Sequence, residues 1–334
     1  MRVPAPSYRS LFLVMAVVTV AALLATVTYA RRAEAARRES DLRNEMNPVA
    51  ISLAHLRDQE FEFTVTNYGY TYKGKTGELI DDCVLTFGAW EKFMLLFMDD
   101  YVRAAGLQGT AFVDVGANTG THTLFMAPRV KEVHAVEPFP PVLKRLHENV
   151  AINKFANVRV HEVGFGDKDG EIPFFAPEES NTGGGTFRPG DKEKKPFGNL
   201  RVVAGDEYFR TAPNAPTVPV GLLKMDIEGY EEAALKGLRK TLERDRPLVI
   251  FEVTTAHHQV GGTIGSFDQL KGLFPADYHF LMFATVQRHF LDGNYDVQEF
   301  APAAEQFFRA EKQKDLIAVP AEKLPLVPRR RGGN

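Results

Sequence analysis

The residues best suited to binding chemistry stand at Val113–Gly120, where an acidic side chain and a glycine-rich turn end a short apolar run, Ala111–Val115. Glycine tolerates backbone dihedrals that other residues avoid, and it lets the backbone approach a ligand closely. Ligands of open α/β sheets bind at the carboxyl ends of the strands. We therefore predict a ligand-binding turn here rather than a purely structural one. Its residues are Asp114, Gly116, Ala117, Asn118 and Gly120.

The spacing within this turn narrows the choice of ligand. A dinucleotide fingerprint reads Gly-x-Gly-x-x-Gly, with an acidic residue ~20 positions further on. Here the spacing is Gly116-x-x-x-Gly120, so that fingerprint is missing, whereas Glu137 still follows the next apolar run and can accept both hydroxyls of a ribose. The carboxylate of Asp114 disfavours a phosphate and favours a positive charge. S-adenosylmethionine combines a positive centre, an amino-acid moiety and a ribose, and it fits these residues.

A second acidic segment, Lys224–Glu231, follows another apolar run. Alternation along a strand places Asp226 and Glu228 on the same side. Two carboxylates at a strand end are costly to bury without partners, which indicates a site. The alternative is an acidic cluster that stabilises the dipole of the next helix. The candidates for a general base are Asp226, Glu228, Glu252, His122, His257 and His258.

No tight cluster of histidines, cysteines and carboxylates is visible in the sequence, so we predict no metal site. The formal net charge of -3 argues against a nucleic-acid partner, which would require a basic face. The single Cys83 excludes an intrachain disulfide.

Short apolar runs that alternate with amphipathic segments must position these side chains. Strands are predicted at 111–115, 133–136, 158–165, 222–227 and 248–253, with closing strands at 278–285 and 315–319. Helices are predicted over 89–103, from 121, over 141–154 and after 229, the last with Ala234, Leu235, Leu238 and Leu242 facing inward. This alternation predicts an α/β fold with a mostly parallel sheet and helices on both faces. A long insert separates the third and fourth strands, and Tyr68, Tyr70 and Tyr72 alternate as in an edge strand.

An uncharged, mainly apolar segment occupies residues 11–30. About 20 such residues in a helix span the ~30 Å hydrocarbon core of a bilayer. The segment exceeds the ~7–15 apolar residues of a signal peptide, which is the alternative, so we predict a retained single-pass membrane anchor. Arginines are more frequent after this segment than before it, which predicts a cytosolic catalytic part.

These features divide the chain into five parts. They are a short tail (1–10), the transmembrane anchor (11–30), a juxtamembrane linker and N-terminal extension (31–78), the main domain (79–320) and a flexible basic tail (321–334).

Several of these segments together resemble the FkbM-type methyltransferases over about residues 80–320. The resemblance is carried by Val113–Gly120, Glu137-Pro138, Asn149 to Asn153, Lys224–Glu231, Pro247–Glu252 and Asp315–Pro320. It implies a Rossmann-like class I methyltransferase sheet. It also implies that the turn after the first strand lines the methionine and sulfonium, that Glu137 holds the ribose, and that Asp167 lies near the adenine. Asp226 and Glu228 would face the transferred methyl group and the acceptor.

The sequence thus predicts a membrane-anchored methyltransferase that uses S-adenosylmethionine to methylate a hydroxyl of a small molecule, lipid or glycan. Two alternatives stay open. One is a non-catalytic, membrane-tethered binding module that keeps the fold but not the acidic residues at the strand ends. The other is an NAD-dependent oxidoreductase, which requires the missing dinucleotide fingerprint.

Overall fold

The computed structural model describes residues 60–177, 184–187, 195–255, 264–284, 293–310 and 313–331, all within one compact unit, Gln59–Asn334. The predicted anchor at 11–30 lies outside these ranges. Within them, no helix is both long and apolar enough to cross a membrane.

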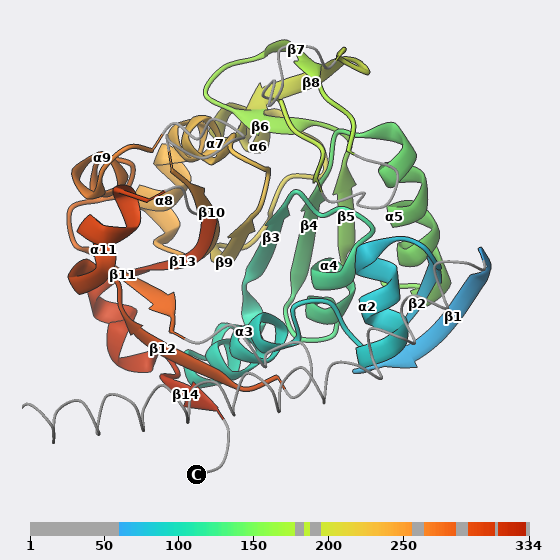
Figure 1. Cartoon of the computed structure of the whole chain (residues 1–334), viewed down its shortest axis with the longest axis horizontal. Coiled ribbons are helices and arrows are strands. Elements are labelled where there is room, and N and C mark those ends of the chain that lie inside the picture. The colour runs from blue at the N-terminus through green and yellow to red at the C-terminus, as the bar shows by residue number, and fades with distance from the viewer. Residues whose placement is uncertain are drawn as a thin grey trace, which may run out of the picture. The chain divides into compact units, whose positions relative to one another are not determined.

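The elements alternate along the chain much as the sequence predicts (Figure 1). The strands are β1 (Glu62–Asn67), β2 (Tyr70–Lys75), β3 (Ala111–Val115), β4 (Glu132–Val136), β5 (Val158–His161), β6 (Gly164–Gly166), β7 (Gly170–Phe174), β8 (Gly198–Ala204), β9 (Val220–Met225), β10 (Leu248–Thr254), β11 (Tyr278–Phe283), β12 (Tyr295–Glu299), β13 (Gln313–Pro320) and β14 (Arg330–Arg331). The helices are α2 (Leu79–Phe87), α3 (Lys92–Ala104), α4 (Thr121–Met126), α5 (Pro140–Asn153), α6 (Gly205–Thr211), α7 (Glu231–Gly237), α8 (Arg239–Asp245), α9 (Phe267–Gly272) and α11 (Ala301–Phe308), with short 3-10 helices at Leu107–Gly109 and Ala321–Leu326.

The main sheet has the order β14-β12-β11-β13-β10-β9-β3-β4-β5. Its central strands, from β10 to β5, pair in parallel. β13 runs antiparallel between β10 and β11, so the sheet is mixed toward its C-terminal side. The strand order reverses between β3 and β9, and ligands of such sheets bind at this switch point.

Helices cover both faces of the main sheet, as predicted. On one face, α3 and α4 pack against apolar residues of β3, β9 and β10. On the other face, α7, α8, α9 and α11 pack against the alternate residues of the same strands. Because neighbouring residues of a strand point to opposite faces, both faces of these strands must be apolar, and β3 and β9 are buried along their whole length.

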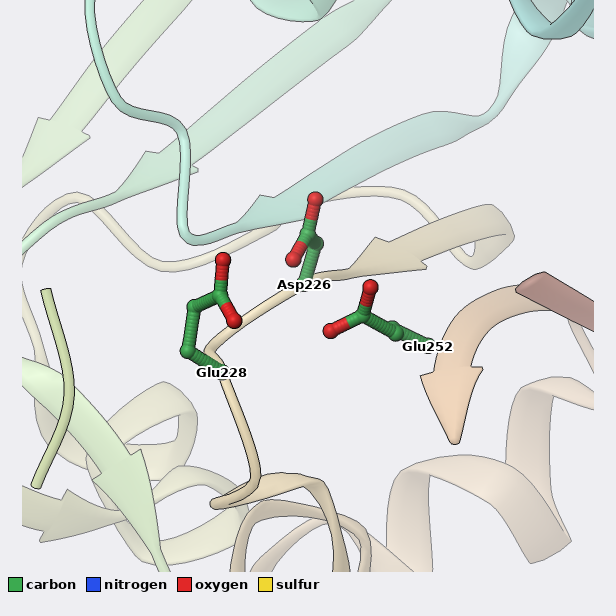
Figure 2. Close-up of side chains that lie close together, drawn as sticks. All are labelled: Asp226, Glu228 and Glu252. Carbon is green, nitrogen blue, oxygen red and sulfur yellow. The ribbon is translucent and has the colours of Figure 1, made fainter. Parts of the chain in front are cut away.

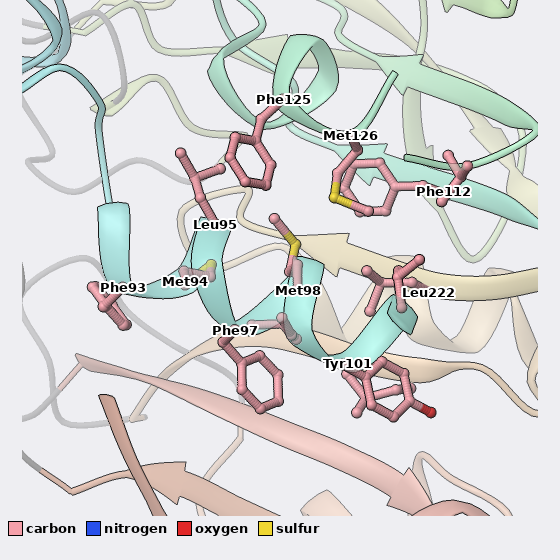
Figure 3. Packing of buried hydrophobic residues seen from close by; sticks show 14 of the residues in the cluster. Phe93, Met94, Leu95, Phe97, Met98, Tyr101, Phe112, Phe125, Met126 and Leu222 are labelled. Atoms are coloured by element: carbon pink, nitrogen blue, oxygen red, sulfur yellow. The ribbon is translucent and has the colours of Figure 1, made fainter. Parts of the chain in front are cut away.

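Helix α3 fills the space in front of the sheet, as its helical apolar spacing predicts. Its side chains interlock with those of α4, β3 and β9 (Figure 3). Phe93 and Phe97 also meet Phe283 of β11 edge to face, with ring centroids 5.0 and 5.3 Å apart. The helix begins later than predicted, since Glu91 has a left-handed backbone conformation that ends the preceding turn.

The hairpin β1–β2 joins the main domain through two asparagines of α5. Asn149 Oδ1 accepts the backbone N–H of Lys73, and Asn153 Oδ1 accepts that of Thr71. Asn149 Nδ2 also donates to the carbonyl oxygen of Thr119, in the turn after β3. The sequence predicts a domain boundary at residue 79, between the hairpin and the main domain. The hairpin nevertheless contacts that domain directly.

Three further predictions differ from the structure in detail. The expected strand 158–165 is broken into β5 and β6, because the chain leaves the main sheet after His161 and β6 pairs with β8. The expected helix after 229 is divided at Leu238 into α7 and α8, although its predicted apolar side chains are all buried. The expected flexible tail contains a 3-10 helix and β14, in which Arg331 pairs with Tyr295.

Two buried histidines, His134 of β4 and His161 of β5, stack on the face covered by α6. His134 Nδ1 and His161 Nε2 lie 3.0 Å apart, and Tyr208 Oη lies 3.2 Å from His161 Nδ1. Burial lowers the pKa of both imidazoles, that of His161 to about 3 with a smaller contribution from His134. Both rings are therefore neutral in the folded protein at neutral pH.

This pair should make the folded protein sensitive to acid. An unfolded histidine gains its proton near pH ~6.5. Since the folded pKa of His161 is far lower, stability is lost as pH falls from ~6.5 toward 3, by ~2 kcal/mol at pH 5. His161→Gln should reduce the difference in unfolding free energy between pH 7.5 and pH 5 by this amount, measured by urea unfolding. The exposed His147→Gln is the control, and an equal change in both variants would contradict the assignment.

Candidate active site

The turn after β3 passes against the end of β9 with no room for a side chain. Gly116 has a φ of +82°, and a Cβ placed on it would lie 1.9 Å from the carbonyl oxygen of Asp226. The backbone N–H of Asp226 in turn donates to the carbonyl oxygen of Val115. The predicted glycine turn is thus required by the approach of two strand ends, which the sequence motif could not reveal.

Glu137 lies directly after β4 and holds this turn from the other side. Its Oε2 accepts the backbone N–H of Asn118 at 3.0 Å, and its Oε1 accepts that of Phe139 at 2.9 Å. Burial raises the pKa of Glu137 to about 7, against the opposing effect of these two hydrogen bonds. Glu137 also lines the cavity at this turn, and its role in holding a ribose stays a prediction.

Beneath the turn lie two buried polar side chains, Asp114 and His122, and the largely buried Glu91. Asp114 Oδ2 accepts the hydroxyl of Thr123 at 2.7 Å. His122 Nε2 lies 3.2 Å from Glu91 Oε2, but not in a direction that makes a hydrogen bond. Asp114 Oδ1, His122 Nε2 and Glu91 Oε2 therefore have no hydrogen-bond partner among the described residues. Buried polar atoms are normally paired, so these atoms point to a polar ligand.

His122 is a poor candidate for a general base. Burial lowers its pKa to about 3, with a further contribution from the positive charge of Lys224. An imidazole with so low a pKa takes up a proton only weakly at neutral pH. Its place beneath the turn is that of a neutral hydrogen-bonding group.

Lys224 supplies the positive charge of the site. It lies within β9 and is buried, and its Nζ stands 3.2 Å from Asp226 Oδ2. Burial by itself lowers the pKa of this ammonium, but the nearby carboxylates, chiefly those of Asp226 and Glu91, outweigh it and raise the pKa. A charged residue in an otherwise apolar buried run was a visible signal, yet the sequence analysis gave Lys224 no role.

Asp226 and Glu228 come together, but not for the reason predicted. β9 ends at Met225, so both residues lie in the following loop, and Glu228 has a φ of +51°. Strand alternation therefore does not apply. The loop is held instead by Glu231, whose Oε1 accepts the backbone N–H groups of Ile227 and Gly229. The role of Glu231 in this acidic segment is therefore structural, because its carboxylate holds the backbone of the loop.

Glu252 of β10 completes a group of carboxylates with Asp226 and Glu228. One carboxylate oxygen from each residue lies within 4.8 Å of the others. Figure 2 shows the three carboxylates turned toward a common point, from two loop positions and a strand. Burial, with the charge of Asp226, raises the pKa of Glu228 to about 8 and that of Glu252 well above its usual range.

Two cavities are each lined by one carboxylate of this acidic group. The first is lined by the turn, by Glu137 and by Asp226, with the rings of Phe139, Phe174 and Phe187 around it. The second has a volume of about 450 Å³ and combines an apolar lining with polar residues at the end of β10 and the start of β13. Its lining residues are Glu252, Met282, Phe300, Ala303, Gln306, Phe307, Gln313, Lys314 and Asp315.

The remaining predicted residues are divided. Ala117 and Gly120 belong to the turn, where Gly120 has a φ of +97°. Asp167 is exposed after β6 and is not among the residues that line the first cavity, so its proposed place near an adenine stays a prediction. His257 and His258 lie outside the described residues.

The aromatic residues of the first cavity were not predicted from the sequence. Phe139 directly follows Glu137-Pro138 and could have been found from that position. Phe174 and Phe187 come from β7 and the insert and carry no local signal. The ring of Phe174 contacts both of the others. Its centroid lies 5.0 Å from that of Phe139 and 5.2 Å from that of Phe187.

Comparison with known proteins places this arrangement in a family. The family model described as the methyltransferase FkbM domain matches residues 114–285, about half of the chain. This stretch contains the turn, Glu137, the acidic loop and Glu252.

Individual relatives match shorter parts. Methyltransferase 1 of Beauveria bassiana is 27% identical over 164 residues, which cover 43% of this chain and 64% of the relative. The hexuronic acid methyltransferase AglP of Haloferax volcanii is 30% identical over 132 residues, or 39% of this chain and 50% of that protein. This chain thus spans only part of both relatives. Among solved structures, methyltransferase FkbM from Methylobacillus flagellatus KT has 16% identity and a TM-score of 0.39, over 63% of this chain and 44% of that one.

Proposed function

Because the chain belongs to the FkbM family of S-adenosylmethionine-dependent methyltransferases, we propose that it methylates a hydroxyl oxygen of an acceptor bound beside Glu252. One observation carries this proposal. Asp226 lines the cavity at the glycine turn, Glu252 lines the larger cavity, and one carboxylate oxygen of each lies within 4.8 Å of the other. A cofactor and an acceptor in these two cavities are therefore brought together at one point, as a transfer reaction requires.

The residues of the first cavity, with Asp114 beneath the turn, fit the cofactor. The unpaired Asp114 Oδ1 beneath the turn suits the ammonium of the methionine moiety, and Glu137 suits the ribose hydroxyls. The phenylalanine rings give an apolar slot of the kind that a planar base requires. When bound, this cofactor supplies a methyl carbon that is electrophilic because it is attached to a positively charged sulfur.

The acidic surroundings favour a hydroxyl over an amine as the acceptor. Asp226, Glu228 and Glu252 stabilise a nearby positive charge, so they keep an amine protonated and its lone pair blocked. A hydroxyl donates its hydrogen to a carboxylate instead. As the new O–CH₃ bond forms and the S–CH₃ bond breaks, the electron pair stays on sulfur and the hydroxyl proton passes to a carboxylate, for which Asp226 is placed.

The second cavity suggests the kind of acceptor. Phe300 and Phe307 offer apolar surface, and Gln313 and Glu252 offer polar groups at the mouth. The C–H faces and hydroxyls of a sugar suit such a mixture. Since one relative is named a hexuronic acid methyltransferase, we propose a sugar hydroxyl as the first acceptor to test. Attachment to a membrane through residues 11–30 would bring the site near lipid-linked sugars, and it stays a proposal from the sequence.

Titration calorimetry of the full chain tests the cofactor site. S-adenosylmethionine should bind saturably and NAD should not. Loss of a hydrogen bond to a charged group costs ~1.5–3 kcal/mol, so Asp114→Ala and Glu137→Ala should each weaken binding ~10–100-fold. Glu162→Gln, an exposed carboxylate beyond the end of the neighbouring strand β5, is the matched control.

The outcomes separate the alternatives. A folded protein that binds neither ligand would favour the non-catalytic module, and a preference for NAD would favour the oxidoreductase. Transfer of a labelled methyl group to hydroxyl-bearing sugars, compared with amino sugars of the same size, then tests the acceptor. Methylation of the amino sugars alone would contradict the hydroxyl proposal.

A further inference from the structure

A group of three carboxylates beside the proposed reaction centre has too little positive charge around it. Asp226, Glu228 and Glu252 each turn an oxygen toward a common point (Figure 2), and Asp315 pairs across from Glu252 on β13. Lys224 contacts this group through Asp226, and the charge of Lys314 acts on Asp315, so four carboxyl groups lie near two cations. Bringing like charges together away from water is costly unless a cation balances them.

Glu252 gives a second and independent indication. Its Oε2 is fully buried and has no hydrogen-bond partner among the described residues. Its carboxylate points at the other two, as Figure 2 shows. A buried carboxyl oxygen without a partner is rare in folded proteins, so a ligand atom is expected at this position.

We infer that Asp226, Glu228 and Glu252 bind a divalent cation between the two cavities. Carboxylate oxygens are the ligands preferred by the hard cations Mg²⁺, Ca²⁺ and Mn²⁺. Ligand oxygens lie ~3–4 Å apart around Mg²⁺ at ~2.1 Å and up to ~4.8 Å apart around Ca²⁺ at ~2.4 Å. The three oxygens, all within 4.8 Å of one another, are already arranged at this scale. The sequence predicted no metal, because these residues come from two separate segments.

Neighbouring hydrogen bonds orient two of the ligands. Lys224 Nζ donates to Asp226 Oδ2 at 3.2 Å, and Gln313 Nε2 donates to Glu228 Oε2 at 3.2 Å. Contacts of this kind fix the direction of a metal ligand and are part of a functional metal site. Each donor binds one oxygen of its carboxylate. The direction of the second oxygen of that carboxylate is thereby fixed.

The cation has a consequence for the reaction, which rests on the proposed function. An acceptor oxygen that loses its proton beside three carboxylates is repelled by them. A divalent cation would remove this repulsion, hold the acceptor oxygen and lower the pKa of its hydroxyl. Cation binding itself does not depend on that activity and can be measured without acceptor or cofactor.

The test uses Mn²⁺ as the probe, with the full chain and no cofactor. Electron paramagnetic resonance of free Mn²⁺ should show one ion bound per chain, displaced by Mg²⁺ or Ca²⁺. Glu252→Gln, Asp226→Asn and Glu228→Gln should each weaken binding at least tenfold, since each removes one charged ligand. Glu299→Gln is the control, because Glu299 is an exposed carboxylate paired with Arg329.

Folding of each variant is checked by circular dichroism, and three variants keep the test decisive if one of them unfolds. No binding of Mn²⁺ at millimolar concentration, or binding that the three variants leave unchanged, would overturn the inference. Titration with S-adenosylmethionine in EDTA separates the two proposals. Cofactor binding with no Mn²⁺ binding would leave the proposed function standing and remove the metal site.

Discussion

Gly116→Ala is expected to abolish binding of S-adenosylmethionine, with an increase in Kd of at least ~100-fold. The added Cβ would overlap the carbonyl oxygen of Asp226 at 1.9 Å, so the turn after β3 and the loop after β9 must move apart. That movement displaces both walls of the first cavity at once. The left-handed backbone at this position adds a cost of ~1–2 kcal/mol for any residue with a Cβ.

Gly77→Ala is the matched control for this variant. Gly77 has a φ of +91°, close to that of Gly116, but a Cβ there would meet no atom within 4 Å. It should therefore lose ~1–2 kcal/mol of unfolding free energy and keep its cofactor affinity. Comparable Kd values for wild type and Gly116→Ala would show that the turn does not form the cofactor site.

Lys224→Met is expected to be among the most destabilising single changes. Removing one partner of a buried ion pair costs ~3–5 kcal/mol, because the other charges stay buried without compensation. For a domain of this size the cost corresponds to a fall in Tm on the order of 10 °C. Urea and thermal unfolding of the purified variant measure both quantities.

A second lysine provides the comparison. Lys236 forms an exposed pair with Glu232 at 2.7 Å, within one helical turn of α7. Pairs of this kind contribute ~0.3–0.5 kcal/mol, so Lys236→Met should be almost neutral. If the two variants lose similar free energy of unfolding, the charge of Lys224 does not compensate the buried carboxylates of the site.

The sequence predicts the scaffold well, because the scaffold depends on local patterns. Runs such as Ala111–Val115 and Leu248–Val253 carry mostly apolar residues on both faces. A strand with this pattern must be buried on both faces. The glycine turn and Glu137 were found for a related reason, since each directly follows such a strand. Their positions at a common sheet edge then follow from parallel pairing.

The site is less predictable where it depends on contacts between distant segments. Glu91 and Asp315 are separated from Lys224 by more than 80 residues, yet both influence its charge. The convergence of Asp226 and Glu252 could not be predicted for the same reason, since spacing along the chain does not show it. The expected side-by-side placement of Asp226 and Glu228 was right in outcome, but it depends on a loop held by Glu231 rather than on strand alternation.

The contacts of the β1–β2 hairpin also bear on where the working unit of this protein begins. Tyr72 Oη lies 2.7 Å from Thr119 Oγ1, and Asn149 connects the same turn to Lys73. Contacts to the underside of the glycine turn thus come in part from chain that precedes the region shared with the family, which starts at residue 114. A domain cut to the limits of that shared region would retain the residues that line the first cavity and lose the contacts that the hairpin makes to the turn.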